Sequence, residues 1–101
     1  MRARALLVIT IYGADWCSDC RRAKNVLDAA KIAYEYLQVD RDPAAMARAI
    51  EISGAKSIPV VVFSDGSYLI EPDVQALLGA ARRTGATRSF DELEMETGGG
   101  D

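Results

Sequence analysis

Histidine is absent from this chain of 101 residues, and its absence excludes several kinds of site. Without an imidazole there can be no Ser-His-Asp or Cys-His catalytic arrangement and no histidine-ligated metal ion. The chain has only two cysteines, which are too few to close a tetrahedral zinc site within one chain. The sequence therefore predicts no resident metal ion and no tightly bound cofactor.

Long apolar runs are also missing. The run Leu6–Ile11 is much shorter than the ~20 residues that a membrane-spanning helix needs, so we expect no membrane partner. Met1–Ala5 followed by this run is a poor match to a signal peptide, because the next residues resemble part of a fold and not a cleavage site. We therefore expect a cytoplasmic protein. Half of the residues are apolar, which predicts one compact domain.

An excess of positive charge is missing as well. The formal net charge is −3, and residues 1–83 carry 11 basic and 10 acidic residues. From Thr84 onward there are one basic and five acidic residues. A chain without a net basic face is not expected to bind nucleic acid. We predict that residues 1–83 form the domain and that residues 84–101 are a disordered, acidic tail with glycines near its end.

Apolar periodicity and turn residues predict an alternating order of strands and helices. The predicted strands are Leu6–Tyr12, Tyr34–Val39, Pro59–Phe63 and Tyr68–Ile70. The predicted helices run from about Cys20 to Lys31, from Asp42-Pro43 to about Ile52, and from Pro72 to Arg83. The opening unit implies two parallel strands joined by a right-handed crossover, and a tight turn at Ser64–Ser67 adds an antiparallel hairpin. The fold class is therefore α/β, a four-stranded mixed sheet flanked by three helices on its two faces (β-α-β-α-β-β-α).

The most informative motif is Cys17-Ser-Asp-Cys20, in which both cysteines stand where a central strand gives way to a helix. This spacing in a strand–helix–strand context is typical of a redox site. Unpaired N–H groups and the positive end of the helix dipole stabilise a thiolate there. Cys17, at the first turn, gains most from both effects. We predict that Cys17 attacks a disulfide and that the more buried Cys20 resolves the resulting mixed disulfide.

Other interpretations of the motif stay open at this point. Arg21, Arg22 and Lys24 would favour a thiolate if they face it, whereas Asp15 and Asp19 would oppose it. A passive structural disulfide is a second interpretation, although such bonds are unusual in the cytosol. An iron–sulfur cluster or metal ion carried between two copies of the chain is a third.

Residues around the motif also allow more than one role. Trp16 either forms an aromatic wall that packs on a substrate or anchors the loop before the first cysteine. Tyr12 is predicted to pack in the core. Pro59 opens an apolar strand, and Glu71-Pro72-Asp73 is predicted first of all to cap the last helix.

Three segments together resemble the glutaredoxins: Trp16–Arg21, the strand entry Ser57–Pro59 and the hairpin Phe63–Ser67. More narrowly, residues 5–83 are similar to the small bacterial glutaredoxin-like proteins that include the mycoredoxins. The resemblance implies a thioredoxin-like fold. It also implies an enzyme that carries out thiol–disulfide exchange through its two cysteines and reduces protein disulfides or mixed disulfides between proteins and a small thiol.

The resemblance further implies a thiol-binding groove beside the attacking cysteine. Pro59 would be cis and would lie opposite that cysteine, and Ile58 would offer its backbone N–H and C=O to an extended thiol peptide. Lys56 would hold a carboxylate of the bound thiol, and Asp73 would meet its other end. With Trp16, these are the thiol-binding residues that we expect.

Two departures from the family bear on the partner. Ser18-Asp19 stands where the family usually has Pro-Tyr, a pair that tunes the reduction potential. Ile70–Asp73 stands where glutathione-binding members have a Gly-Gly pair, so mycothiol is a candidate co-substrate beside glutathione. The alternative function is a thioredoxin-like electron donor recharged by thioredoxin reductase, for example for ribonucleotide reductase. In either case we expect a monomer that acts on disulfide-containing or thiolated proteins.

Overall fold

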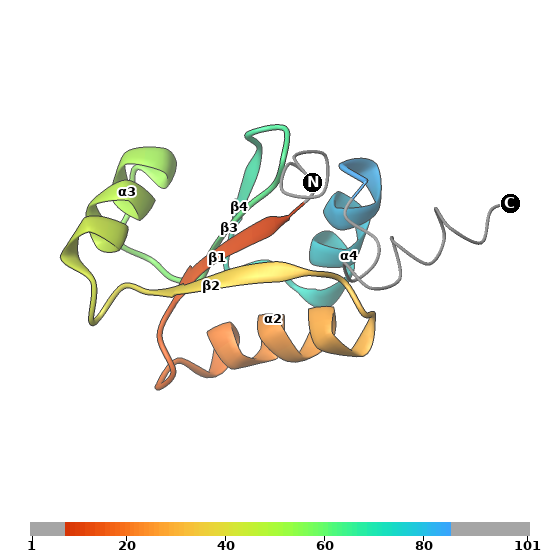
Figure 1. Ribbon diagram of the computed structural model, residues 1–101, viewed down its shortest axis with the longest axis horizontal. Coiled ribbons are helices and arrows are strands. Elements are labelled where there is room, and N and C mark those ends of the chain that lie inside the picture. Colours follow the sequence, from red (N-terminus) through yellow and green to blue (C-terminus); the bar gives the residue numbers. More distant parts are fainter. Residues whose placement is uncertain (1–7, 86–101) are drawn as a thin grey trace, which may run out of the picture.

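The computed structural model describes residues 8–85, which form one sheet with three helices around it (Figure 1). The strands are β1 (Ile9–Gly13), β2 (Tyr34–Gln38), β3 (Val60–Val62) and β4 (Tyr68–Ile70). The helices are α2 (Ser18–Ala29), α3 (Pro43–Ser53) and α4 (Val74–Arg83). The order of elements is the predicted one, and the predicted α/β fold class is confirmed.

The strands lie side by side in the order β2-β1-β3-β4. β1 and β2 are parallel, with Ile9 opposite Tyr34 and Gly13 opposite Gln38. β3 is antiparallel to both β1 and β4. β1 is therefore an inner strand with neighbours on both edges, which explains its apolar and β-branched composition.

Helices cover both faces of the sheet (Figure 1). Helices α2 and α4 pack on one face, in a cluster of buried side chains that includes Ile9, Ile11, Ala23, Leu27, Val61, Phe63, Leu77, Ala80 and Ala81. Helix α3 packs on the other face, in a smaller cluster of Tyr12, Val39, Ala45, Ala49 and Val60. Tyr12 thus lies in the core under α3, as predicted.

The boundaries of the first helix differ from the prediction of Cys20–Lys31. Helix α2 begins at Ser18 because Cys17 is its N-cap, in an extended conformation that opens the first turn. It ends at Ala29, and Lys31 has a φ of 60°, a left-handed conformation that cannot continue a right-handed helix. The apolar positions that defined the prediction mark only the buried face, so they miss the polar first turn.

The other boundaries shift by one or two residues. β3 covers Val60–Val62 and not Pro59–Phe63, because proline has no N–H to give to the sheet. β2 ends at Gln38, one residue before the predicted Val39. Helix α4 begins at Val74 and not Pro72, because Asp73 is its N-cap. Leu6, Leu7 and the predicted tail beyond residue 85 lie outside the described residues.

Two predicted turn features explain where α3 begins and ends. Asp42 caps its start by accepting hydrogen bonds from Ala44 N and Ala45 N, at 3.1 and 3.3 Å, and Pro43 is the first helical residue. Gly54 ends α3 with a φ of 75°, which glycine adopts without steric cost. Within residues 8–85, no helix combines the length and the apolar character required to span a membrane.

Candidate active site

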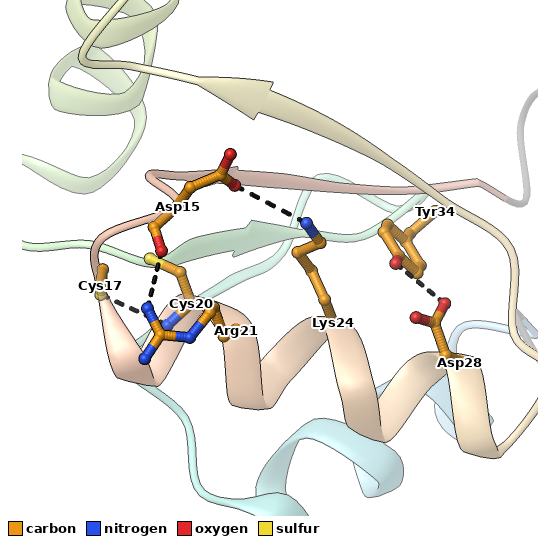
Figure 2. A network of polar contacts seen from close by, with 7 residues as sticks. All are labelled: Asp15, Cys17, Cys20, Arg21, Lys24, Asp28 and Tyr34. Atoms are coloured by element: carbon orange, nitrogen blue, oxygen red, sulfur yellow. Dashed lines mark hydrogen bonds and ion pairs between the residues drawn. The ribbon is translucent and has the colours of Figure 1, made fainter.

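Cys17 lies at the junction of β1 and α2, where the chain leaves the sheet (Figure 2). Its backbone N donates to Ala14 O at 3.1 Å, which closes the turn between strand and helix. Its Sγ accepts a hydrogen bond from the backbone N of Cys20 at 3.3 Å. A sulfur in the N-cap position therefore receives one of the unpaired N–H groups of the first helical turn.

Cys20 lies one turn further along α2, on the buried face. Its side chain is fully buried, whereas Cys17 is partly exposed, and both are free thiols. Burial and, to a smaller extent, the hydrogen bond to Cys17 raise the pKa of Cys20 from 9.0 to about 12. At neutral pH Cys20 is therefore a protonated thiol that solvent does not reach.

Charged side chains around the motif are paired with one another. Arg22 contacts Asp19 at 2.9 Å and Lys24 contacts Asp15 at 3.8 Å. Arg21 donates to the backbone O of Asp15 at 2.7 Å (Figure 2). The Cys17 sulfur itself accepts its hydrogen bond from the backbone N–H of Cys20.

Trp16 is an exposed side chain beside the motif. Its exposed fraction is 68%, so it does not anchor the loop by burial. Its indole N–H donates to Asp40 Oδ2 at 3.2 Å, which fixes the ring from one edge. Sequence reasoning did not identify Asp40. The parallel register that places Gly13 opposite Gln38 brings the ends of β1 and β2 together, and this long-range pairing places Asp40 beside Trp16.

The segment before β3 has the conformation that the resemblance implies. The Ile58–Pro59 peptide bond is cis. Pro59 is fully buried, Ile58 is partly buried and Lys56 is exposed. Asp73 is also exposed, and its Oδ1 accepts a hydrogen bond from Ala76 N at 2.7 Å. Its predicted capping role is therefore confirmed.

Sequence reasoning also missed Gly13 and Tyr36, which surround the buried cysteine. A Cβ atom on Gly13 would lie 2.8 Å from Cys20 Sγ and 2.9 Å from Tyr36 Oη. Both atoms therefore occupy space that only a glycine leaves open. Lys24 lies over the Tyr36 ring, with Nζ 4.1 Å from the ring centroid. Within residues 8–85 there is no group of three or more histidine, cysteine or carboxylate side chains that could hold a metal ion.

Comparison with known proteins identifies the family. The glutaredoxin family profile matches residues 9–69, more than half of the chain. This chain belongs to the glutaredoxin family. A provisionally named glutaredoxin of Mycobacterium tuberculosis is 37% identical over 65 residues, which are 63% of this chain and 77% of that protein. Mycoredoxin 1 of Corynebacterium glutamicum is 34% identical over 65 residues, 63% of this chain and 80% of that protein.

A third relative of this glutaredoxin is the glutaredoxin-like protein NrdH of Escherichia coli. It is 35% identical over 60 residues, 59% of this chain and 73% of NrdH. The solved structure of NrdH-redoxin from that organism superposes with a TM-score of 0.63 and covers 72% of this chain and 93% of its own. The fold is thus thioredoxin-like, and the chain is a thiol–disulfide oxidoreductase of a family that works with small thiols.

Proposed function

We propose that Cys17 is the attacking thiolate of this glutaredoxin and that Cys20 is the resolving thiol. In the first step, Cys17 Sγ bonds to one sulfur of a substrate disulfide, and the other sulfur leaves as a thiolate. In the second step, Cys20 Sγ bonds to Cys17 Sγ, and the substrate sulfur that was bonded to Cys17 is released as a thiol. The two cysteines are thereby oxidised to a disulfide, and the substrate disulfide is reduced to two thiols.

The observation that carries this assignment is the difference between the two sulfurs. Cys17 is partly exposed and accepts a backbone hydrogen bond, a contact that favours a thiolate. Cys20 is buried, with its pKa raised to about 12 by that burial. Only Cys17 therefore combines access to a substrate with a contact that supports the nucleophilic form.

Matched single variants test the division of roles. Cys17→Ser is expected to abolish reduction of a mixed disulfide between a peptide and a small thiol. Cys20→Ser is expected to retain part of that activity, because an external thiol can take over the resolving step. The same two variants are then assayed on a protein disulfide, where both should be inactive. Equal loss of mixed-disulfide reduction in the two variants would contradict the assignment.

A small thiol is proposed as the reductant, bound beside Cys17 by Trp16, Lys56, Ile58, Pro59 and Asp73. The buried ring of Pro59, the partly buried Ile58 and the exposed side chains of Lys56 and Asp73 support this groove. We propose mycothiol or glutathione as the co-substrate. The similarity to mycoredoxin 1 and the Ile70–Asp73 segment in place of a Gly-Gly pair favour mycothiol.

The second candidate function is that of an electron donor reduced by thioredoxin reductase. The 35% identity to NrdH and the same Ile70–Asp73 departure favour it. One experiment separates the candidates: the oxidised protein is offered glutathione, mycothiol, or NADPH with thioredoxin reductase, and Trp16 fluorescence follows reduction. Fast reduction by one small thiol alone supports the groove. Reduction by the flavoenzyme alone contradicts the groove and supports the electron donor.

The cellular setting follows from the same chemistry. Free thiols must be kept reduced for the first step, and a reducing cytosol provides that condition. We therefore propose a cytoplasmic monomer whose partners are disulfide-containing or thiolated proteins. Size-exclusion chromatography with light scattering tests the monomer, and a stable dimer would contradict it.

A further inference from the structure

The hydroxyl of Tyr36 is a buried polar group that the steps above leave without a role. Its Oη atom has no hydrogen-bond partner among residues 8–85, although buried hydroxyls are as a rule hydrogen-bonded. It borders the same small space beside Gly13 as the Cys20 sulfur, as the two short distances from a Cβ on Gly13 show. The β1–β2 register, which pairs Tyr36 with Ile11, fixes the ring on the face of the sheet that α2 covers.

The second step of the exchange requires that a negative charge on the Cys20 sulfur be stabilised at this position. Before substrate binds, burial and the Cys17 side chain raise the pKa of the Cys20 thiol, whereas the backbone of Ala14 and the hydroxyl of Tyr36 lower it. Once Cys17 is in a mixed disulfide, its sulfur carries no thiolate. Cys20 must then itself become a thiolate, and it must do so in a fully buried position. A buried thiolate is strongly disfavoured unless hydrogen-bond donors stabilise it, and the Tyr36 hydroxyl is the side-chain group that lowers the pKa of Cys20.

We propose that the Tyr36 hydroxyl donates a hydrogen bond to Cys20 Sγ as this sulfur becomes the thiolate that resolves the mixed disulfide. This inference rests on the proposed role of Cys20 as the resolving thiol. The Cys20 proton leaves, Cys20 Sγ bonds to Cys17 Sγ, and the bond from Cys17 to the substrate sulfur breaks. The departing substrate thiolate takes up the proton that Cys20 gave up, so the step needs no further reactant.

The groups that face Tyr36 keep it in the form of a donor. Burial, and the negative charges that Cys20, Asp15 and Cys17 can carry, raise the pKa of Tyr36 well above its ordinary value. Lys24 of α2 lies over its ring and pairs with Asp15 of the β1–α2 loop. Gly13 of β1 adds no titratable side chain. Tyr36 therefore keeps its proton and offers it in a hydrogen bond.

Stopped-flow reaction of the reduced protein with dithiobis(nitrobenzoate) separates the two steps. Attack by Cys17 releases one equivalent of coloured thiol at a rate proportional to the reagent. Resolution by Cys20 releases a second equivalent at a rate independent of the reagent. Tyr36→Phe keeps the ring and removes only the hydroxyl. Tyr34→Phe is the matched control. Tyr34 lies on the same strand, but its hydroxyl donates a hydrogen bond to Asp28 Oδ1 at 2.9 Å, away from the cysteines (Figure 2).

We expect Tyr36→Phe to slow the second phase and to leave the first within about twofold of wild type. Loss of a donor lowers the thiolate fraction of Cys20 tenfold or more, but a more basic thiolate is a stronger nucleophile. The net slowing near pH 7 is therefore about three- to tenfold. The pH dependence of the second phase should also move to higher pH. Tyr34→Phe should change neither phase.

Each result has a distinct meaning. Release of only one equivalent by wild-type protein would refute Cys20 as the resolving thiol, and with it the proposed function. Two equivalents from wild type, with an unchanged second phase in Tyr36→Phe, would refute the role of Tyr36 alone. Equal slowing of both phases, or an unshifted pH dependence, would show that Tyr36 only supports the fold.

Discussion

Replacement of Gly13 by alanine tests the packing on which the site depends. The new Cβ would lie 2.8 Å from Cys20 Sγ, 2.9 Å from Tyr36 Oη and 3.1 Å from Cys20 Cβ. Neither neighbour is the free end of a flexible surface chain, because Cys20 is buried and Lys24 covers the Tyr36 ring. Overpacking of this kind costs about 1–3 kcal/mol. For a domain of this size, a loss of ~2 kcal/mol lowers the Tm by roughly 8–16 °C.

Gly79→Ala is the matched control within α4. There a Cβ would meet only Arg83 Nη1, at an ordinary contact distance of 3.5 Å. Both substitutions reduce the entropy of the unfolded chain alike. The difference between their effects on the free energy of unfolding therefore isolates the close contacts of the new Cβ at position 13. Gly79→Ala should raise stability by about 0.4–1 kcal/mol. Thermal unfolding followed by circular dichroism measures both variants. A Gly13→Ala protein as stable as Gly79→Ala would refute the packing described around Cys20.

Three further outcomes are expected. The pKa of Cys20 rises from 9.0 to about 12, and that of Tyr34 from 10.0 to about 12. The folded state holds protons that the unfolded chain releases, so urea unfolding should show stability falling as pH rises from about 9 to 12; a constant value would contradict this. Asp42→Ala removes the α3 cap and should cost about 1 kcal/mol in the same assay. Leu27→Ala, at a fully buried position, should lower the free energy of unfolding by about 2–5 kcal/mol. A loss comparable to that of Asp42→Ala would show that neighbouring side chains fill the cavity that Leu27 leaves.

The order of elements could be predicted because each carries a local signal. Asp42-Pro43 and Gly54 bound α3 through caps that act within a few residues. The beginning of α2 could not be placed from periodicity, because Cys17 caps it with a sulfur and the first turn is polar. Cysteine is not a common N-cap residue, so the motif places Cys17 at the first turn without marking it as the cap itself.

The residues of the candidate site also fall into two groups, those with a local signal in the sequence and those placed by long-range contacts. Cys17 and Cys20 are apparent from their spacing and from the strand before them, which are local properties. Tyr36 and Asp40 belong to the site only because β2 pairs with β1 in one particular register. That register depends on the path of the whole α2 crossover. No local pattern in the sequence reveals that path. Long-range partners of a motif are therefore what sequence reasoning misses.

The chemical difference between the two cysteines follows from one helical turn. A spacing of three residues lets the N–H of Cys20 reach the sulfur of Cys17, and it places the Cys20 side chain on the buried face of α2. One residue more or fewer between the cysteines would turn Cys20 by about 100° around the helix axis. That rotation would move its side chain away from Gly13 and Tyr36 and out of reach of Cys17. The same spacing thus sets which cysteine is partly exposed and which one lies buried beside Gly13 and Tyr36.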